Sequence, residues 1–458
     1  MLTGWRRSAD RPPAAAVRCG NRALRPDRPE TGSLKASDPP LRADLLSILR
    51  AAIDAVDPFP LTTSALSDSA LSQQVLCIAA GKAAWPMARA ASAFLGPRLR
   101  TGLIAGPAGG MVAGFEWFDA PHPFPDSESE RAARRALTLA AQARLEGADL
   151  LVLLSGGASS FLALPAEGIS LEDKRVVAGQ LMEAGSDIAT LNCVRKHLSA
   201  IKGGRLAAVA GRTLTLAISD VHDPPDDPAT IGSGPTVPDP STFADALRII
   251  AAAGLGIPPT VREHLERGAA GTRQESPKPG DPRLADSHFL VIANRHTSER
   301  GAADDAARRG YGVVVMPQPT RGEAATAGRA FAIEALRVAS NGRPVCVIGS
   351  GEPTVTVSGK GHGGRNQEFA LGAAEVLADA HSTALLASVG TDGVDGPTDA
   401  AGALVGAGTV ARAAARGAGI GDALSNNDAY PLLDALGDLI RWGPTLTNVG
   451  DLHVLLSR

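Results

Sequence analysis

Short apolar runs that alternate with Ala-rich stretches predict an α/β fold for this chain. Nine runs rich in Val, Leu and Ile end in small residues, and many stretches between them place apolar residues at helical spacing. Apolar strands separated by helices are typical of mostly parallel sheets that are covered by helices on both faces. A chain of 458 residues is long enough for two or three such domains.

The composition excludes several classes of protein. The 45 Lys and Arg residues nearly balance 48 Asp and Glu, so the chain lacks the basic field of a nucleic-acid binder or a peripheral membrane protein. No apolar run reaches the roughly 18–20 residues of a membrane span. Four widely spaced cysteines without a CxxC pair predict neither a disulfide scaffold nor a zinc site. We therefore expect a cytoplasmic monomer or homodimer whose partners are small molecules.

The elements follow in order from these patterns. Residues 1–40 are rich in Arg and Pro without a sustained apolar period, so we expect a disordered extension there. The next segment, LRADLLSILRAAIDAV, predicts a helix from residue 41, and Ala-rich helices are expected at 131–145 and 323–339. Strands are expected in the runs 75–82, 101–106, 150–157, 213–220, 288–294, 312–316, 344–352, 384–393 and 452–456.

The polar, Pro- and Gly-rich stretch 267–286 is the best candidate for a domain boundary. We therefore expect a first α/β domain at 41–285 and a second α/β domain at 286–458. Ligands of open α/β sheets bind beyond the carboxyl ends of the strands. Polar residues directly after each strand are therefore the candidates for function.

Two loops in the first half have the features of anion-binding sites. Lys82 follows Gly81 at a strand end, and because only seven residues of the chain are lysine, a lysine in a Gly-rich loop favours a use for its compact charge. An ordinary surface lysine remains the alternative. The loop 155–160 joins glycines, which let the backbone approach an anion, to serine hydroxyls, and predicts a phosphate or carboxylate cradle.

A third stretch, 191–207, clusters Arg195, Lys196, His197 and Lys202 ahead of two glycines. Such a cluster suits an acidic substrate or a phosphate. When the cluster is considered alone, a solvated helix face is the better explanation.

Carboxylates follow two of the expected strands. Asp220 and Asp392 each lie at the carboxyl end of an expected strand. Carboxylates at such a position suit Mg²⁺, because this ion takes one or two carboxylates together with phosphate oxygens and water. Asp226 and Asp227 belong to an Asp- and Pro-rich segment that predicts turns. Asp395 is expected to shape a turn, as is Asp399.

Among the candidate functional loops, the stretch 347–377 carries the most specific motif. Arg365 follows four nearby glycines at a helix entry, where it is well placed to meet phosphoryl oxygens. Gly359-x-Gly361-x-x-Gly364 matches the dinucleotide fingerprint, but Asp392 lies 28 residues after Gly364, whereas the ribose-binding acid is expected roughly 20 residues on. NAD binding is therefore a weaker alternative. We expect His362 to be a hydrogen-bonding loop residue rather than a base.

Together these loops resemble the class II glycerate 2-kinases, a family with an N-terminal domain of the glycerate-kinase type and a C-terminal MOFRL domain. The resemblance runs in order through residues 41–458. The matching stretches are AAGKAA (79–84), LLSGGASS (153–160), LNCVRKHLSAIKGG (191–204), AISD (217–220), GSGPTVPD (232–239), GSGEPTVTVSGKGHGGRNQE (349–368), SVGTDGVDGPTDAAG (388–402) and TNVGDLHVLL (447–456).

The resemblance implies ATP-dependent phosphorylation of D-glycerate at its 2-hydroxyl, with Mg²⁺. It also implies that two α/β domains, the N-terminal one Rossmann-like, enclose the active site in a cleft. The family's essential lysine and arginine correspond to Lys82 and Arg365. One departure is the segment 222–225, His-Asp-Pro-Pro, which lengthens a turn, so Asp226 and Asp227 are not carried over as ligands. Some members have been labelled hydroxypyruvate reductases, so an NAD(P)H-dependent reductase remains an alternative. A catalytically inactive small-acid binding protein is the alternative from another class.

Residues and resemblance together assign candidate roles. Phosphoryl transfer depends on positioning and charge stabilisation, so the candidate catalytic residues are Lys82, Arg365, Asp220 and Asp392. The two aspartates are also the candidate metal ligands, and one of them would accept the hydroxyl proton. The candidates for binding the substrate or a phosphate are Ser155, Gly156, Gly157, Ala158, Ser159, Lys196, Ser233 and Gly234. The candidates for binding the nucleotide are Gly351, Glu352, Lys360, Gly361, Gly363, Gly364 and Asn448.

Overall fold

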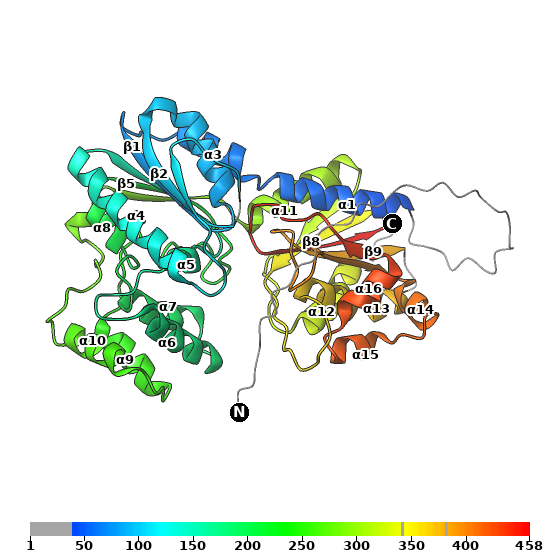
Figure 1. Cartoon of the computed structure of the whole chain (residues 1–458). Coiled ribbons are helices and arrows are strands. Elements are labelled where there is room, and N and C mark those ends of the chain that lie inside the picture. Colours follow the sequence, from blue (N-terminus) through cyan, green and yellow to red (C-terminus); the bar gives the residue numbers. More distant parts are fainter. Residues whose placement is uncertain (1–38, 108, 340–342, 381–382) are drawn as a thin grey trace, which may run out of the picture. The chain divides into compact units, whose positions relative to one another are not determined.

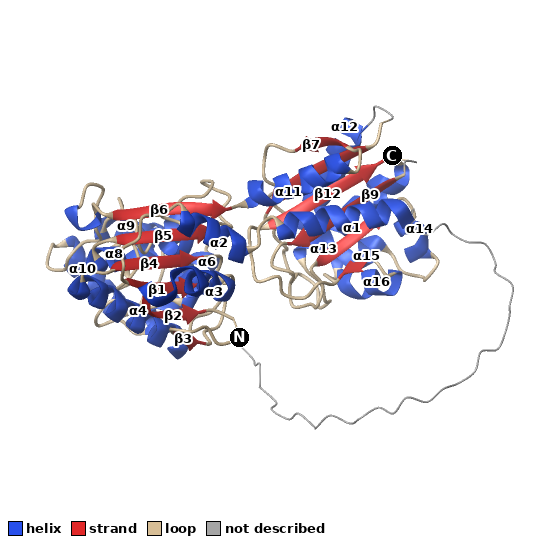
Figure 2. Ribbon diagram, turned by 90° about the horizontal axis from the view of Figure 1, so that it is seen from above, coloured by secondary structure: helices blue, strands red, loops and turns tan. Residues whose placement is uncertain are grey.

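Two six-stranded sheets, each with helices on both faces, organise the chain in this computed structural model (Figures 1 and 2). The structure describes residues 39–107, 109–339, 343–380 and 383–458. The extension expected at 1–40 lies outside these residues except for Pro39 and Pro40, which begin the first helix. Proline is well suited to that position, because the first turn of a helix leaves its N–H groups unbonded.

The first sheet has the strand order β3-β2-β1-β4-β5-β6, and all of its pairs are parallel. β1 and β4 are buried along their whole length, which explains why the sequence gives them apolar residues at nearly every position rather than at alternate ones. The strands are β1 (Val75–Ala80), β2 (Leu99–Ala105), β3 (Phe115–Phe118), β4 (Asp149–Leu154), β5 (Thr213–Ile218) and β6 (Ser287–Ala293).

Helices cover both faces of this sheet. One core lies under α4 (Ser127–Glu146), α5 (Ala158–Phe161) and α8 (Arg205–Ala210). The other lies under α2 (Pro58–Ser67) and α3 (Ala84–Leu95). A satellite core joins four more helices beside the sheet: α6 (Leu171–Glu183), α7 (Ile188–His197), α9 (Phe243–Ala252) and α10 (Pro259–Ala269).

The second sheet has the order β11-β10-β9-β12-β8-β7 and is mixed. Only β7 and β8 pair in parallel; the other four pairs are antiparallel. The expectation of mostly parallel pairing is therefore wrong for this sheet. The reason is that residues 391–401 join β9 to β10 without a crossover helix, and β12 runs against both of its neighbours. The strands are β7 (Gly312–Val315), β8 (Val345–Gly351), β9 (Ala384–Gly390), β10 (Gly402–Gly406), β11 (Leu439–Ile440) and β12 (Asp451–Ser457).

Helices again cover the two faces of the second sheet. One face carries α1 (Pro39–Asp54) and α11 (Arg295–Arg308), which lie side by side (Figure 1). The other carries α12 (Ala324–Ala339), α13 (Arg365–Asp379), α14 (Thr409–Ala414), α15 (Ile420–Ser425) and α16 (Ala429–Leu436).

The division at residue 285 remains a prediction, but sheet membership places two segments elsewhere. β6 follows residue 285 and still pairs with β5 in the first sheet. α1 precedes the whole first sheet and yet packs on the second one. The chain therefore crosses between the two sheets after α1 and again after β6.

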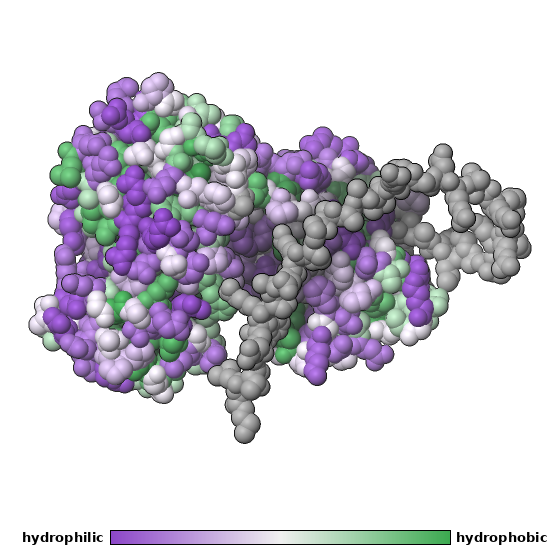
Figure 3. All heavy atoms as spheres, viewed as in Figure 1, coloured by the Kyte–Doolittle hydropathy of each residue, from purple (hydrophilic) through white to green (hydrophobic). Residues whose placement is uncertain are grey.

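The surface mixes residue types, as expected for a folded chain with buried sheets. Figure 3 shows hydrophilic side chains over most of the visible face, with hydrophobic ones scattered among them. Among the described residues, no helix is both long and apolar enough to cross a membrane.

Candidate functional site

The strand order of the first sheet fixes where a ligand is expected. The order reverses between β1 and β4, and open α/β sheets bind ligands in the crevice at such a switch point. Lys82 follows β1 and Ser155 follows β4, so the two loops meet there. The backbone N–H of Lys82 donates to the carbonyl of Gly156 at 2.9 Å, and the N–H of Ala83 donates to Ser155 Oγ at 2.9 Å.

The Lys82 side chain pairs with an aspartate that follows β9. Lys82 Nζ lies 2.5 Å from Asp392 Oδ2, and both side chains are partly exposed. The structure thus brings together the lysine and one of the two aspartates expected to be catalytic. Asp392 therefore neutralises the charge of Lys82 in this structure.

Asp220 lies at the end of β5, against Gly156 and Asn448. Asn448 Nδ2 donates to Asp220 Oδ2 at 2.7 Å, and a Cβ on Gly156 would meet both side chains. Burial raises the pKa of Asp220 to about 6, Glu352 adds to this effect, and Lys82 opposes it. A carboxylate with that pKa is suited to accept a proton near neutral pH.

A cavity of about 710 Å³ opens beside Asp220. Loops of the first sheet supply most of its wall, including residues 155–159, 220–223 and 230–233. Four residues near the second sheet complete it: Arg321, Gly322, Glu352 and Thr354. Its size is in the range of pockets that enclose small ligands.

Serines and a buried lysine form one side of this cavity. Ser159 Oγ and Ser233 Oγ lie 2.9 Å apart, and Ser233 also donates to Asn192 Oδ1 at 2.9 Å. Lys202 is 2% exposed, and its ammonium donates to Ser159 Oγ at 2.8 Å, as well as to the carbonyls of Ser159 and Gly232. These bonds fix the position of Ser159 within the loop 155–160.

Lys196 does not line this cavity. Its ammonium is buried 3.5 Å from Asp239 Oδ1, in an ion pair that supports the satellite core. The neighbouring Arg195 lines the cavity instead, near Asn192 and without an acidic partner among the described residues. The two residues are adjacent on α7, so successive side chains point in different directions, and the sequence pattern does not say which one faces the ligand.

Arg365 begins α13 and is held by two carboxylates. Its Nε and Nη2 donate to the two oxygens of the buried Asp451 at 2.7 and 3.0 Å, and Nη1 donates to Glu352 at 2.9 Å. Burial alone would lower the pKa of Arg365, but Asp451 and Glu352 outweigh it and raise that pKa. Glu352 also lines the cavity, which connects Arg365 to the loops around Asp220.

The glycine-rich loop 359–364 packs against another loop of its own domain. The N–H of Gly361 donates to the carbonyl of Asn426 at 2.8 Å, and a Cβ on Gly359 or Gly361 would meet residues 426–428. Gly363 contacts Ala429, and Gly364 lies against Asp395. The Lys360 side chain is exposed. Close packing of chain on chain therefore explains these glycines without a nucleotide.

Three further residues considered in the sequence analysis, Gly234, Gly351 and His362, do not line the cavity. Gly351 is buried at the end of β8, where its backbone lies against Thr320. Gly234 adopts a left-handed conformation with φ +58° beside Ala229 and Val237. His362 is exposed and stacks edge-on against Tyr430, in agreement with the prediction of a loop histidine.

Several aspartates have structural partners, as expected for turn residues. Asp227 accepts from the Ala229 N–H and the Thr230 hydroxyl. Asp226 accepts from Asn294 Nδ2, and Asp395 accepts from the N–H groups of Asn366 and Gln367, the second and third residues of α13. Asp395 thus supplies the helix cap that Gly364, at the N-cap position, does not.

Two histidines near the site were not expected from the sequence. His122 follows β3 and lies against Gly157, where an added Cβ would be 2.8 Å from the ring; burial lowers the pKa of His122, and Lys82 lowers it further. His222 lines the cavity, and both of its buried ring nitrogens lack a partner among the described residues. The only sequence signal was the flanking proline of each segment, which marks a turn and not a site.

The donor set suits a metal that arrives with its ligand rather than one held by the chain alone. No cluster of three or more His, Cys, Asp or Glu side chains forms a metal site within the described ranges. Four acidic residues line the cavity, Asp187, Asp220, Asp223 and Glu352, and of these Asp220 alone is not exposed. One partly buried carboxylate fits Mg²⁺, which is commonly bound by one or two carboxylates plus substrate phosphates and water.

Comparison with known proteins identifies two family regions in the chain. Residues 44–266 match the family described as a domain of unknown function, DUF4147, and residues 345–451 match the MOFRL family. The segment between them contains β6, α11, β7 and α12.

Relatives match the chain over nearly its whole length. A glycerate 2-kinase of Pyrococcus horikoshii is 37% identical over 430 residues, which cover 90% of this chain and 96% of the relative. A protein of Agrobacterium vitis, whose name assigns it provisionally to hydroxypyruvate reductases, is 39% identical and covers 92% of this chain and 95% of its own. The crystal structure of a glycerate kinase from Thermotoga maritima superposes with a TM-score of 0.82 at 36% identity, covering 92% of this chain and all of that one.

Proposed function

Because the chain belongs to the glycerate 2-kinase family, it is a phosphotransferase, and we propose that it transfers a phosphoryl group from ATP to the 2-hydroxyl of D-glycerate. The observation that carries this proposal is the position of Asp220. It combines a pKa of about 6 with a place on the wall of a cavity, beside the 155–160 loop and within electrostatic reach of Lys82. A proton acceptor, an anion cradle and a cation are the parts that phosphoryl transfer to an alcohol requires.

The acid is held, in this proposal, by the side of the cavity that is rich in hydrogen-bond donors. Arg195 offers a guanidinium without a competing acid among the described residues, and the Asn192 amide nitrogen, on the same wall, is a buried donor without a partner among them. Guanidinium groups bind carboxylates through two parallel hydrogen bonds, which also fixes the orientation of the ligand. This arrangement would direct the 2-hydroxyl toward Asp220 across the cavity.

The transfer itself places new charge between the two catalytic cations. Asp220 takes the proton of the 2-hydroxyl as its oxygen attacks the γ-phosphorus, and ADP leaves with the bridging oxygen. Lys82 and Arg365 stabilise the negative charge on the transferring group. We assign Asp392 the task of orienting Lys82, since the two are paired at 2.5 Å.

The nucleotide is assigned to the part of the cavity near the second sheet. Glu352 lines that part, and Asn448 lies beside Asp220. Gly351, Lys360, Gly361, Gly363 and Gly364 remain proposals for this role. Asp392, together with the nucleotide phosphates, would hold Mg²⁺, which supplies charge neutralisation at the phosphates when it is bound. Asp220, the other candidate metal ligand, is assigned the proton instead.

The wider setting is also a proposal. We infer small molecules as the partners, with a monomer or homodimer as the working unit. Cys77, Cys193 and Cys346 are buried free thiols, which agrees with a reducing cytoplasm.

The deciding experiment couples ADP formation to identification of the product. With D-glycerate, ATP and Mg²⁺, we expect ADP and 2-phosphoglycerate in equal amounts, with the isomer assigned by ³¹P NMR. Formation of the 3-isomer would contradict the proposed orientation of the acid. Absence of ADP together with measurable glycerate binding would support the inactive binding protein instead.

The reductase alternative has one supporting observation, the name of the Agrobacterium vitis relative. Its sequence basis was the Gly359–Gly364 fingerprint, and these glycines pack against residues 426–429. Mixing the enzyme with NADH or NADPH and hydroxypyruvate separates the two functions. We expect no enzyme-dependent oxidation of the nicotinamide; steady oxidation at a rate comparable with ADP formation would overturn the kinase assignment.

A further inference from the structure

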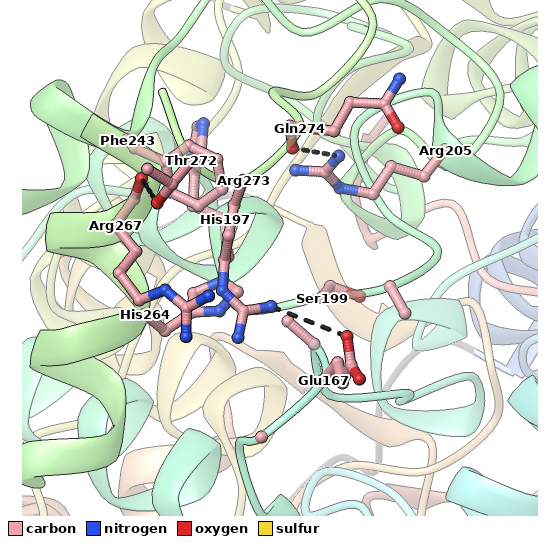
Figure 4. A pocket seen from close by; sticks show the side chains of 13 residues that line it. Glu167, His197, Ser199, Arg205, Phe243, His264, Arg267, Thr272, Arg273 and Gln274 are labelled. Atoms are coloured by element: carbon pink, nitrogen blue, oxygen red, sulfur yellow. Dashed lines mark hydrogen bonds and ion pairs between the residues drawn. The ribbon is translucent and has the colours of Figure 1, made fainter. Parts of the chain in front are cut away.

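A second cavity lies on the satellite core, and no residue of its wall belongs to the cavity around Asp220. It measures about 590 Å³ and is drawn in Figure 4. Its wall comes from the end of α7, the start of α8, α10 and the loop that follows α10. None of the proposed catalytic steps uses it.

The charged groups that line this cavity are mostly cationic. Within the described residues they are three arginines, Arg205, Arg267 and Arg273, and one glutamate. That glutamate, Glu167, is 95% exposed and 3.9 Å from Arg273, and Arg267 makes an exposed pair with Glu263 at 3.7 Å. Exposed pairs of this kind contribute little, so the arginines remain available to an anion.

Several polar atoms of this wall are buried without a partner. Arg205 Nε and Arg273 Nε lack a hydrogen-bond acceptor in the described part of the chain. Arg205 does donate from Nη1 to the carbonyl of Gln274, at 3.5 Å, the limit of a hydrogen bond. A buried donor left without an acceptor is costly, and a bound acceptor removes that cost.

His264 adds another buried polar atom to the wall of the second cavity. It is 6% exposed, and its Nε2 lies 3.0 Å from the carbonyl of His197, so Nε2 carries the hydrogen and donates it. Its Nδ1 is buried without a partner among the described residues, and the residue lines the cavity. Figure 4 shows the Arg267 and Arg273 side chains beside His264, with Arg205 approaching from another direction.

Apolar surface completes the wall. The Phe243 ring packs edge-on against His197 and His264, with centroids 4.8 and 5.5 Å apart, and Ala166 and Ala200 lie nearby. The volume is in the range of small-molecule sites and exceeds what a single inorganic phosphate would fill. Guanidinium groups around a partly apolar cavity match an organic molecule that carries a phosphoryl group.

We propose that this second cavity binds a small organic phosphate through Arg205, Arg267 and Arg273. The site is distinct from the phosphoryl-transfer cavity, but α7 reaches both: Asn192 and Arg195 line the first cavity and His197 lines the second. Two kinds of small organic phosphate fit this description: a phosphorylated three-carbon acid and a nucleoside monophosphate. The test therefore uses 2-phosphoglycerate and AMP as separate probes.

Binding is measured by isothermal titration calorimetry on the full chain. D-Glycerate and a non-hydrolysable ATP analogue with Mg²⁺ are kept at saturation so that the first cavity is filled. We expect one probe to bind at one site per chain. Its Kd should rise at least about tenfold in Arg273→Gln and in Arg267→Gln, because each loses a charge-assisted hydrogen-bonding group. Arg262→Gln is the matched control, since Arg262 is exposed on the same helix, α10, outside the cavity wall.

Each outcome has a defined meaning. Binding that is unchanged in Lys82→Ala but weakened in the two cavity variants supports the second site independently of the kinase proposal. No binding of either probe, or equal binding in Arg273→Gln and Arg262→Gln, overturns it. Citrate serves as a carboxylate-only probe, and binding of citrate but of neither phosphate would overturn the assignment to organic phosphates. Arg267 is half-exposed, so Arg267→Gln keeps the test valid if Arg273→Gln does not fold.

Discussion

Asp220 shows at the scale of one residue how the fold prepares a proton acceptor. The carboxyl group is surrounded by Gly156, Asn448 and the end of β5, and burial raises its pKa to about 6. Above that pH the group is deprotonated and accepts a proton, whereas below it the group is neutral and does not.

The first prediction concerns the pH dependence of turnover. We expect kcat/KM of the wild-type chain to fall about tenfold per pH unit below a pH of about 6, because the deprotonated fraction of Asp220 falls at that rate. Asp220→Asn should lower kcat by about 10²–10⁴-fold and remove this acidic limb. Asp399→Asn, an exposed control, should keep both the rate and the limb. A wild-type limb that persists in residual Asp220→Asn activity would assign the titration to another group.

The second prediction concerns the two cations. Lys82→Ala should lower kcat by about 10³-fold or more, since it removes a charge that faces the transferring phosphoryl group. Arg365→Lys should also lose most activity, because an ammonium does not reproduce the forked contact with Asp451, yet it keeps the buried carboxylate paired. Arg329→Ala, on the exposed side of α12, is the control. Initial rates with folded protein, checked by circular dichroism, decide the result, and near-normal turnover would remove the residue from the mechanism.

The candidate site could be predicted from the sequence only for residues that come directly after a strand. Lys82, Asp220 and Ser155–Ser159 could be selected because parallel strands place such residues at one edge of a sheet. Arg195 and Lys196 could not be separated, because the orientation of α7 is decided by its packing on the satellite core. His122 could not be found at all, because it reaches Gly157 from a loop 35 residues away in the sequence.

At the scale of elements, α12 and α13 pack closely because of two glycines. A Cβ on Gly328 would meet the backbone of Phe369, and a Cβ on Gly372 would meet the backbone of Ala325. Glycine normally weakens a helix interior, so its presence at both contact points indicates that close approach of the backbones matters more here.

The third prediction tests this packing. Gly328→Ala should destabilise the chain by about 1–3 kcal/mol, because the added methyl group forces the two helices apart. Gly179→Ala in α6 is the matched control: a Cβ there meets nothing within 4 Å, so the substitution should stabilise by about 0.5–1 kcal/mol. Urea denaturation at equal protein concentration measures both. Similar changes in the free energy of unfolding for the two substitutions would mean that helix propensity, and not close packing, determines the effect of Gly328→Ala.

Element prediction detected the strands that contain runs of Val, Leu and Ile, including β7, which has only four residues. It missed β3, β10 and β11. β3 is the aromatic segment Phe-Glu-Trp-Phe, and β11 has two residues, too few to show a period. β10 is Gly-Ala-Leu-Val-Gly, in which only Leu404 and Val405 favour a strand.

At the scale of the whole molecule, the chain passes between the two sheets twice, so no single boundary separates them in the sequence. α1 buries Leu41, Leu45 and Ile48 against the second sheet, although it precedes every strand of the first. Thr447, near the other end of the chain, donates its hydroxyl to the carbonyl of Val56, just after α1. Such pairings over hundreds of residues have no local sequence signal, so the expected single boundary at 285 did not include them.

The fourth prediction follows from this long-range packing. Leu45→Ala should destabilise the chain by about 2–5 kcal/mol, since Leu45 is fully buried. Hydrogen exchange should show the largest loss of protection in β8 and β12 of the second sheet rather than in β1, its nearer neighbour in sequence. Leu145→Ala, at an exposed site on α4, provides the comparison. Loss of protection confined to the first sheet would contradict the observed packing.

The position of β12 has a consequence for how the chain is made. These seven residues end at Ser457 and form an inner strand, between β8 and β9. A ribosome that adds about 5–20 residues per second makes β12 tens of seconds after α1. Until then, α1 and the earlier strands of its sheet expose apolar surface that is buried in the folded chain. Truncation before Asp451 would therefore remove the middle of a sheet, and the nascent chain should depend on chaperones until β12 has been made.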